Sequence, residues 1–326
     1  MEDVASLAGV STMTVSRILR RPEKVNAETT KLVRRAMKTL GYVPNQIAGS
    51  LSARTTPIVA VVVPTVAHSI FADTVQGISD GLRSHGFQIL LGCTNYDPAE
   101  EISLITNLTA WRPSGIVITS VRAGAGALRS FRSLRIPVVE TWDITKDPQD
   151  VVVGFSHFDA GYAMTKYLFE KGYRRIAFAR GQTGDMRSVS RAKGYRAATR
   201  QFGLPDGLNF AFDYSFSTAG GADALRRILD QRADPDAIFF SVDTVALGAL
   251  YECQRLGIAV PRQLAIAGFG DFDEARVAFP SLTTVRVPRY EIGTEAARLL
   301  LARMSGELLP NTRVDLGFEI VARDSA

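Results

Sequence analysis

From residue 57 onward, the sequence alternates short runs rich in β-branched and aromatic residues with amphipathic stretches of helical length. The clearest strand-like runs are 58–63, 115–119, 151–155, 176–179, 237–241 and 264–269. Strands joined through helices lie parallel, with helices on both faces of the sheet, so this rhythm predicts an α/β fold. The length of the region suggests two such sheets. Ligands of these folds bind at the carboxyl ends of the strands.

Several classes of protein are excluded by the composition. The longest apolar runs, such as Ile58–Val63, are far shorter than the roughly 18 residues that a membrane span needs. The chain opens Met-Glu-Asp and lacks the basic start and apolar stretch of a secretory signal, so a cytoplasmic location is expected. The two cysteines, Cys93 and Cys253, are far apart and predict neither a disulfide framework nor a zinc site.

The positive charge of the chain is concentrated at its N-terminus. Residues 1–54 hold nine lysines and arginines against four acidic residues, an excess that equals the formal net charge of +5 for the whole chain. The remaining residues are therefore formally neutral. A basic segment beside a neutral domain indicates an acidic partner such as nucleic acid.

Hydrophobic periodicity predicts three short helices in this basic segment. The first covers 1–8, a turn follows at 9–11, and the second covers 12–19 with Ser11 as its N-cap. The third follows Pro22, is capped by Asn26 and ends at Gly41. The second helix turns Val15, Ile18 and Leu19 inward and leaves outward Thr12, Met13, Ser16 and Arg17.

Two helices about a glycine-containing turn form the helix-turn-helix arrangement, in which the second helix enters the major groove of DNA. Small three-helix modules without this function are also common, so spacing alone leaves both interpretations open. The concentrated positive charge favours DNA binding.

The sequence of this segment closely resembles the N-terminal signature of the lac repressor family. The resemblance is carried by residues 4–17, VASLAGVSTMTVSR, and continues in register at 41–45, GYVPN. It implies that bases are read by Thr12, Met13 and Arg17, and that phosphates are contacted by Ser11, Thr14, Ser16, Asn26, Thr29 and Tyr42. Arginine can chelate guanine O6 and N7, and methionine can lie against a thymine methyl group. The alternatives are a core-filling Met13 and a helix-surface Thr12.

Unlike most members of that family, the chain has no hydroxyl N-cap ahead of its first helix, so Met1 is expected to lie inside the helix. Either the start is trimmed or the helix frays there, since loss of such a cap costs about 1 kcal/mol.

The segment 45–54 is too short to form a stable helix alone, because isolated helices below roughly 12 residues are marginal in water. Asn45 is placed to cap it, and we expect it to fold on binding DNA. The resemblance implies that it pairs with the same segment of a second copy in a homodimer. Leu51 would then enter the minor groove, with Ala48 facing the partner. The alternative is an inert linker.

The resemblance covers essentially the whole chain and implies two Rossmann-like lobes of the periplasmic-binding-protein type around a cleft. The chain would cross between lobes three times, near Phe155, Ser281 and Pro310. The expected divisions are a helix-turn-helix domain at 1–44, a hinge helix and linker at 45–56, an N-terminal lobe of 57–155 with 283–308, and a C-terminal lobe of 156–282 with 309–326.

For a small effector, the resemblance points to residues at strand ends, namely Phe71, Trp142, Arg191, Phe216, Asp243 and Asp271. Aromatic faces with Arg and Asp side chains suit a polyol. Val242 stands where sugar-binding members have Asn, and Gly270 where they have the first Asp of a pair. Loss of a carboxylate suits an anionic ligand, since like charges about 4 Å apart repel by roughly 4 kcal/mol.

Three tracts resemble the gluconate operon repressor branch of the family and sharpen this expectation to gluconate or a related sugar acid. They are ECQRLG at 252–257, AIAGFGD at 265–271 and DLGF at 315–318. A regulator that responds to a neutral sugar is the alternative.

Motifs of enzymes are absent from the sequence, so no catalytic residue, cofactor or metal is expected. Gly124 and Gly126 follow a strand, but position 129 is Arg where a dinucleotide fingerprint requires Gly or Ala. The three histidines share no ligand spacing. The acidic cluster at 271–274 is better interpreted as a solvated loop or a ligand-hydroxyl acceptor. Two other classes of protein remain as alternatives. A periplasmic sugar-binding protein would lack the basic N-terminal segment, and a sugar-processing enzyme would be detected by turnover of a sugar acid by the purified protein.

Overall fold

The computed structural model describes residues 1–20, 22–43, 56–66, 69–119, 136–181, 185–205, 208–212, 216–231 and 234–326. The chain divides into two compact units, Met1–Thr56 and Pro57–Ala326. The predicted hinge segment 45–54 and the loop with Gly124 and Gly126 lie outside the described residues. None of the helices in the described part of the chain has the length and apolarity needed to span a membrane.

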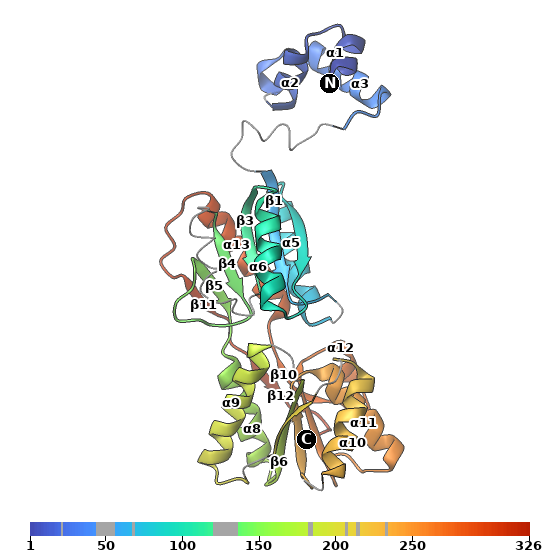
Figure 1. The fold of residues 1–326 in the computed structure, drawn as a ribbon, viewed down its shortest axis with the longest axis vertical. Helices are drawn as coiled ribbons and strands as arrows, with labels where there is room; N and C mark the ends of the chain where they lie inside the picture. Colours follow the sequence, from blue (N-terminus) through green and yellow to red (C-terminus); the bar gives the residue numbers. More distant parts are fainter. Residues whose placement is uncertain are drawn as a thin grey trace. The chain divides into compact units, whose positions relative to one another are not determined.

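The first unit consists of three helices (Figure 1), as the periodicity predicts, and they enclose a small apolar core. They are α1 (Glu2–Ala8), α2 (Thr12–Arg20) and α3 (Ala27–Thr39), with a 3-10 turn η1 (Pro22–Lys24) before α3. Gly9, with φ 65°, ends α1 in the left-handed conformation that a side chain disfavours. The core is formed by Val4, Ala5, Val15, Ile18, Val33 and Ala36. Leu19, predicted to face inward, is 39% exposed.

The second unit contains two sheets, which confirms the α/β prediction. In its N-terminal lobe the strand order is β11-β5-β4-β3-β1-β2. These strands are β1 (Thr56–Val63), β2 (Gln88–Cys93), β3 (Pro113–Ile118), β4 (Val138–Thr141), β5 (Val151–Gly154) and β11 (Arg313–Asp315). The pairs β1–β2, β3–β4, β4–β5 and β5–β11 are parallel.

Helices cover both faces of this first sheet. They are α5 (Ala72–Arg83), α6 (Pro98–Thr109) and α13 (Arg289–Met304), and a 3-10 turn, η2 (Ser69–Phe71), precedes α5. Alternate residues of β1 divide between the faces. Val59, Val61 and Val63 pack in the cluster that contains residues of α5 and α13, whereas Ala60 and Val62 pack with residues of α6. This explains why β1 is apolar throughout: it is buried on both sides.

In the C-terminal lobe the strand order is β12-β10-β9-β8-β6-β7. These strands are β6 (Ile176–Gly181), β7 (Asn209–Phe212), β8 (Ala237–Phe240), β9 (Ala265–Gly270), β10 (Thr283–Arg286) and β12 (Glu319–Val321). One face is covered by α8 (His157–Glu170) and α9 (Met186–Gln201), and the other by α10 (Thr218–Asp230) and α11 (Asp243–Leu256), as Figure 1 shows; a short helix, α12 (Asp273–Val277), follows β9.

Two of the three predicted crossings between lobes are wrong by several residues. The strand 283–286, assigned from sequence to the N-terminal lobe, pairs in parallel with β9 of the C-terminal sheet. The strand 313–315, assigned to the C-terminal lobe, pairs with β5 of the N-terminal sheet. The chain therefore crosses after Gly154, after Arg286 and after Asp315. Both strands are too short for hydrophobic periodicity to indicate the sheet to which they belong. Their sheet is decided by hydrogen bonds to strands that are far away in the sequence.

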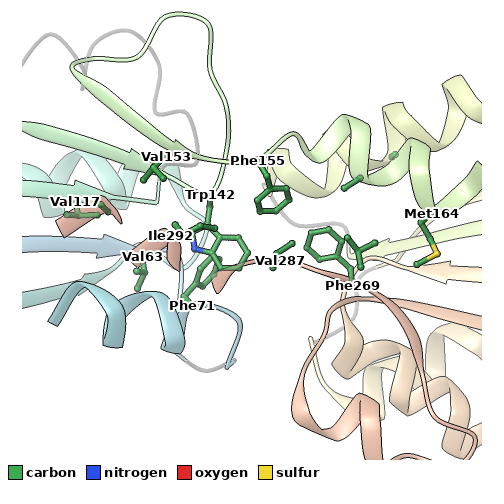
Figure 2. Packing of buried hydrophobic residues seen from close by; sticks show 14 of the residues in the cluster. Val63, Phe71, Val117, Trp142, Val153, Phe155, Met164, Phe269, Val287 and Ile292 are labelled. Carbon is green, nitrogen blue, oxygen red and sulfur yellow. The ribbon is translucent and has the colours of Figure 1, made fainter. Parts of the chain in front are cut away.

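An aromatic cluster connects the two lobes (Figure 2). Phe71 and Trp142 of the N-terminal lobe meet edge to face, with ring centroids 5.0 Å apart. Phe155, at the first crossing, has its ring centroid 6.1 Å from those of both Trp142 and Phe269, and Phe269 lies in β9 of the C-terminal sheet. All four side chains are at most 3% exposed and belong to one apolar cluster. The lobes thus share a continuous core where the chain crosses between them.

Helices α8 and α9 touch through their backbones. A Cβ atom on Gly161 of α8 would overlap the carbonyl oxygen of Arg191, and one on Gly194 of α9 would overlap the carbonyl oxygen of Phe158. Each helix therefore has a glycine at the point where the other helix crosses it. The close approach fixes where the first turns of both helices lie.

Replacing Gly194 by alanine should therefore destabilise the second unit. Alanine is the better helix former by about 1 kcal/mol, but its methyl group must push the two helices apart, an overpacking that costs on the order of 2–3 kcal/mol. We expect a lower unfolding free energy in urea denaturation. The matched control is Lys193→Ala, at an exposed neighbouring position of the same helix, which should leave the unfolding free energy unchanged. Equal unfolding free energies of the two variants would contradict the close contact between α8 and α9 at Gly194.

Candidate functional site

The outer face of α2 presents the three predicted base-reading residues to solvent. Thr12, Met13 and Arg17 are exposed, and Met13 has 69% of its surface accessible. Val15 and Ile18, on the opposite face, are buried in the core of the first unit. Met13 is therefore not the core-filling residue of the alternative interpretation. The helix offers a mixed apolar and cationic surface, as contact with base edges requires.

Several predicted phosphate-contacting residues lie at the N-termini of α2 and α3. Ser11 Oγ accepts a hydrogen bond from the backbone nitrogen of Thr14 at 3.2 Å and lies 3.0 Å from Thr14 Oγ1. Asn26 Oδ1 accepts from the backbone nitrogen of Thr29 at 2.7 Å, as predicted for a helix cap. Each helix thus begins with an ordered polar group beside its positive dipole end, which suits an approaching phosphate.

The other predicted contacts of this unit divide into two sets. Ser16 and Tyr42 are half-buried, and Tyr42 packs against the apolar core of the unit. Asn45, Ala48 and Leu51 lie outside the described residues, so the hinge role assigned to them stays a prediction.

The second unit contains a cavity lined by residues of both lobes. Four of the six predicted effector residues line it: Phe71, Trp142, Arg191 and Phe216. The rest of its lining was not predicted as contacts and consists of Ile70, Tyr96, His157, Asp185, Arg187, Ser241, Val242 and Thr244. These residues follow the carboxyl ends of strands in both sheets, which is where α/β folds bind ligands.

His157, the first residue of α8, fixes the position of Arg191. Its Nε2 lies 2.6 Å from the backbone oxygen of Trp142, which can only accept, so Nε2 carries the hydrogen. Its Nδ1 then accepts from Arg191 Nη1 at 2.9 Å. Burial, together with the charge of Arg191, keeps the pKa of His157 well below its ordinary value, so the ring is neutral. Arg191 Nη2 donates to the backbone oxygen of Ser241 at 3.3 Å.

Arg187 is held differently from Arg191. Its Nε donates to Asp185 Oδ1 at 2.8 Å, and Asp185 is the N-cap of α9. Among the described residues, Arg187 Nη1 and Nη2 have no hydrogen-bond partner although both are buried, and the same holds for Arg191 Nε and Ser241 Oγ. Buried donors without partners are costly. A cluster of them along one cavity indicates a place for an acceptor-rich ligand.

The electrostatics of the cavity favour an anion. Among the described lining residues, two guanidinium groups face a single carboxylate, that of Asp185. Burial alone would raise the pKa of Asp185, but the charges of Arg187 and Arg191 hold it below its ordinary value. Burial lowers the pKa of Arg191 to about 10, which still leaves it protonated at neutral pH. Burial also raises the pKa of Tyr96 to about 12, so its hydroxyl stays neutral.

Aromatic rings form the apolar walls of the cavity. Phe71 and Trp142 meet edge to face, and Tyr96 lies 5.9 Å from Phe216 between ring centroids. Trp142 Nε1 donates to Thr74 Oγ1 at 2.9 Å, and Thr74 Oγ1 donates to the backbone oxygen of Arg289 at 2.7 Å. The polar edge of the indole is therefore satisfied within the protein, and its apolar surface remains for the C–H groups of a ligand.

Asp243 and Asp271, predicted as effector contacts, do not line the cavity. Asp243 Oδ1 accepts from Thr284 Oγ1 at 2.5 Å, and Asp243 Oδ2 accepts from the backbone nitrogen of Phe272 at 2.9 Å. Asp271 accepts from Arg286 Nε at 2.6 Å and from Arg323 Nη2 at 2.5 Å. Both carboxylates join the strand ends of the C-terminal lobe instead.

A carboxylate lies near Arg191, although Gly270 stands where sugar-binding members of the family have the first Asp of a pair. Asp185 Oδ2 lies 3.8 Å from Arg191 Nη2. Asp185 and Arg187 were missed, although a signal for Arg187 existed, since it precedes Arg191 by four residues on one face of a helix. No comparable pattern points to Tyr96 or His157, because the sequence shows only that each follows a strand.

The pH dependence of stability should reveal the burial of Asp243. Burial raises its pKa from 3.8 to about 6, so its contribution is fully present below about pH 4 and is lost as the pH rises through 6. Asp243→Asn cannot ionise. The unfolding free energy of wild type relative to this variant should therefore fall between pH 4 and 7, by on the order of 3 kcal/mol.

Urea denaturation across that pH range measures the difference, and contributions from other groups cancel in it. Asp273→Asn, at an exposed position of α12, is the matched control. Parallel pH profiles for wild type and Asp243→Asn would contradict the prediction.

Comparison with known proteins identifies relatives of both units. Residues 1–45 match bacterial regulatory proteins of the lacI family, and residues 165–326 match the periplasmic binding protein-like domain. The HTH-type transcriptional regulator GntR of Pseudomonas aeruginosa is 36% identical over 326 residues, which are 100% of this chain and 95% of that protein.

Two crystal structures show the same fold. A LacI family transcriptional regulator from Silicibacter pomeroyi superposes with a TM-score of 0.94 at 32% identity, covering 99% of this chain and 98% of the other. Transcription regulator GntR from Chromobacterium violaceum gives a TM-score of 0.79 at 40% identity, covering 82% of this chain and 98% of the other. These relatives are transcription regulators and not enzymes. The chain belongs to the lacI family of bacterial regulatory proteins.

Proposed function

We propose that this protein is a cytoplasmic, homodimeric repressor that binds pseudo-palindromic operator DNA and responds to a sugar acid, gluconate or a close relative. The exposed face of α2 supports the DNA part of the proposal. It carries Thr12, Met13 and Arg17 above a buried core, in a unit that holds the net positive charge of the chain. A two-fold operator requires a two-fold protein, which is the reason for proposing a homodimer.

One observation carries the effector class: the cavity presents buried guanidinium N–H groups that lack partners among the described residues. A carboxylate supplies the acceptors that these donors need, and charge-assisted hydrogen bonds are the stronger kind. Hydroxyl groups of a polyol chain suit Ser241 Oγ and Arg191 Nε, and its C–H groups suit Trp142 and Phe216. The resemblance of residues 252–257 and 265–271 to the gluconate operon repressor branch points to the same class.

Control of DNA binding follows from linkage between the two sites. The cavity is lined by residues of both lobes, so a ligand in it binds one arrangement of the lobes better than another. Operator binding that also favours one arrangement of the lobes is coupled to ligand binding, and each partner then changes the affinity for the other by the same factor.

Sequence-specific DNA binding is tested by fluorescence anisotropy with a duplex selected by the protein from a randomised pool. We expect wild type to bind the selected duplex more tightly than a scrambled one across a salt series, since base contacts add to a phosphate term that salt weakens. Arg17→Ala should reduce the preference by roughly 10-fold or more, because a bidentate contact to a base contributes about 1–3 kcal/mol. Lys38→Ala, at an exposed position of α3, is the control for lost charge. Equal affinity for both duplexes at every salt concentration would refute sequence-specific recognition.

The effector class is tested by titration calorimetry with gluconate, a ketogluconate and idonate, beside glucose and a purine nucleoside as neutral ligands. Binding of at least one acid, with a change in affinity for the selected duplex, is the expected result. Heat with a neutral ligand and none with the acids would overturn the sugar-acid assignment while leaving the DNA-binding proposal intact.

A further inference from the structure

The two arginines of the cavity differ in what their guanidinium groups have left to offer. Arg191 uses Nη1 to reach His157 and Nη2 to reach the backbone oxygen of Ser241, so Nε is its one atom without a partner among the described residues. Arg187 uses Nε to reach Asp185, and neither of its Nη atoms has a described partner. A carboxylate binds an arginine best through two parallel hydrogen bonds. Within the described part of the chain, Arg187 has both Nη atoms available for such a pair of bonds, whereas both Nη atoms of Arg191 are engaged.

The surroundings of Arg187 hold its side chain in place before a ligand arrives. The residue is 5% exposed, and its bond to Asp185 sets the plane of the guanidinium group. Its Cζ lies 5.1 Å from the ring centroid of Phe71, an aromatic residue of the other lobe. Holding the group between a carboxylate and a ring limits its rotamers, so a ligand pays little entropy for ordering it.

We propose that Arg187 is the specificity-determining residue of the cavity and binds the carboxylate of an aldonic acid through Nη1 and Nη2. Arg191 Nε and Ser241 Oγ then bind hydroxyl groups further along the ligand. This inference rests on the proposed function and deepens it, because it assigns the choice between an acid and a neutral polyol to one side chain. Because Arg187 lies beside Phe71, the carboxylate end of the ligand is placed at the boundary between the lobes.

A double-mutant cycle between Arg187 and the ligand carboxylate tests the assignment. The probes are gluconate and the neutral gluconamide, and the proteins are full-length wild type, Arg187→Gln and Arg187→Lys. Wild type should prefer gluconate, and Arg187→Gln should weaken gluconate binding by roughly 10- to 100-fold while changing gluconamide binding by less than about threefold, because a hydrogen bond to a charged group contributes about 1.5–3 kcal/mol.

The conservative variant separates charge from geometry. Arg187→Lys keeps the positive charge but lacks the pair of parallel donors, so its loss for gluconate should be intermediate. The thermal transition of each variant reports whether it is folded. If Arg187→Gln does not fold, Arg187→Lys provides the test. Arg196→Gln, at an exposed position of the same helix, is the matched control and should leave both affinities unchanged.

The outcomes distinguish this inference from the proposed function. If substitution of Arg187 weakens both ligands equally, Arg187 does not bind the carboxylate, and the inference is overturned while the sugar-acid effector stands. If wild type binds gluconamide as well as gluconate, or binds no sugar acid, the effector class itself is wrong. Selective loss of the acid in both variants supports the assignment.

Discussion

The direct contact between the backbones of α8 and α9 is the constraint on which the ligand cavity depends. Gly161 and Gly194 allow each helix to reach the carbonyl oxygens of the other, which no residue with a side chain permits. His157 is the first residue of α8, and Arg187 and Arg191 lie in the first two turns of α9. The hydrogen bond between His157 and Arg191 can form because the helices approach so closely. The cationic wall of the cavity is therefore placed by two residues that carry no functional group.

Several buried donors of this cationic wall have no hydrogen-bond partner among the described residues. Arg191 donates to the ring of His157 and to the backbone oxygen of Ser241, and His157 is itself held by the backbone oxygen of Trp142. Arg191 is therefore part of the scaffold as much as of the site. Arg187 has two buried nitrogens, Nη1 and Nη2, that find no hydrogen-bond partner among the described residues. Leaving buried donors unpaired lowers the stability of the empty protein, and a ligand that pairs them recovers that free energy on binding. The Nη donors of Arg187 therefore lower the stability of the protein without ligand and raise its affinity for a ligand that pairs them.

Local patterns in the sequence predicted the elements well. Side-chain chemistry within a few residues determines the helix caps at Ser11 and Asn26, the three helices of the first unit and the apolar strands. The structure shows each of them. The four cavity residues were named through the resemblance to the lac repressor family, which points to residues at strand ends.

The failures concern choices between distant partners. Thr283–Arg286 and Arg313–Asp315 are short strands whose sheet depends on hydrogen bonds to residues far away in the sequence. Asp243 and Asp271 follow strands as the true lining residues do, but Thr284, Arg286 and Arg323 engage their carboxylates. A position after a strand indicates that a side chain is near the cavity. Whether the side chain lines the cavity depends on whether neighbouring residues already engage it in hydrogen bonds.

The indole of Trp142 gives the molecule an optical reporter of its own state. The chain has two tryptophans. Trp111 is 49% exposed, whereas Trp142 is 1% exposed, lines the cavity and is linked through Thr74 to the backbone of Arg289. Arg289 in turn donates to the carbonyl oxygen of Gly270 in the opposite lobe. We therefore expect the emission of Trp142 to change when the cavity is filled or when the contact between the lobes changes, whereas that of Trp111, outside the cavity lining, should stay constant.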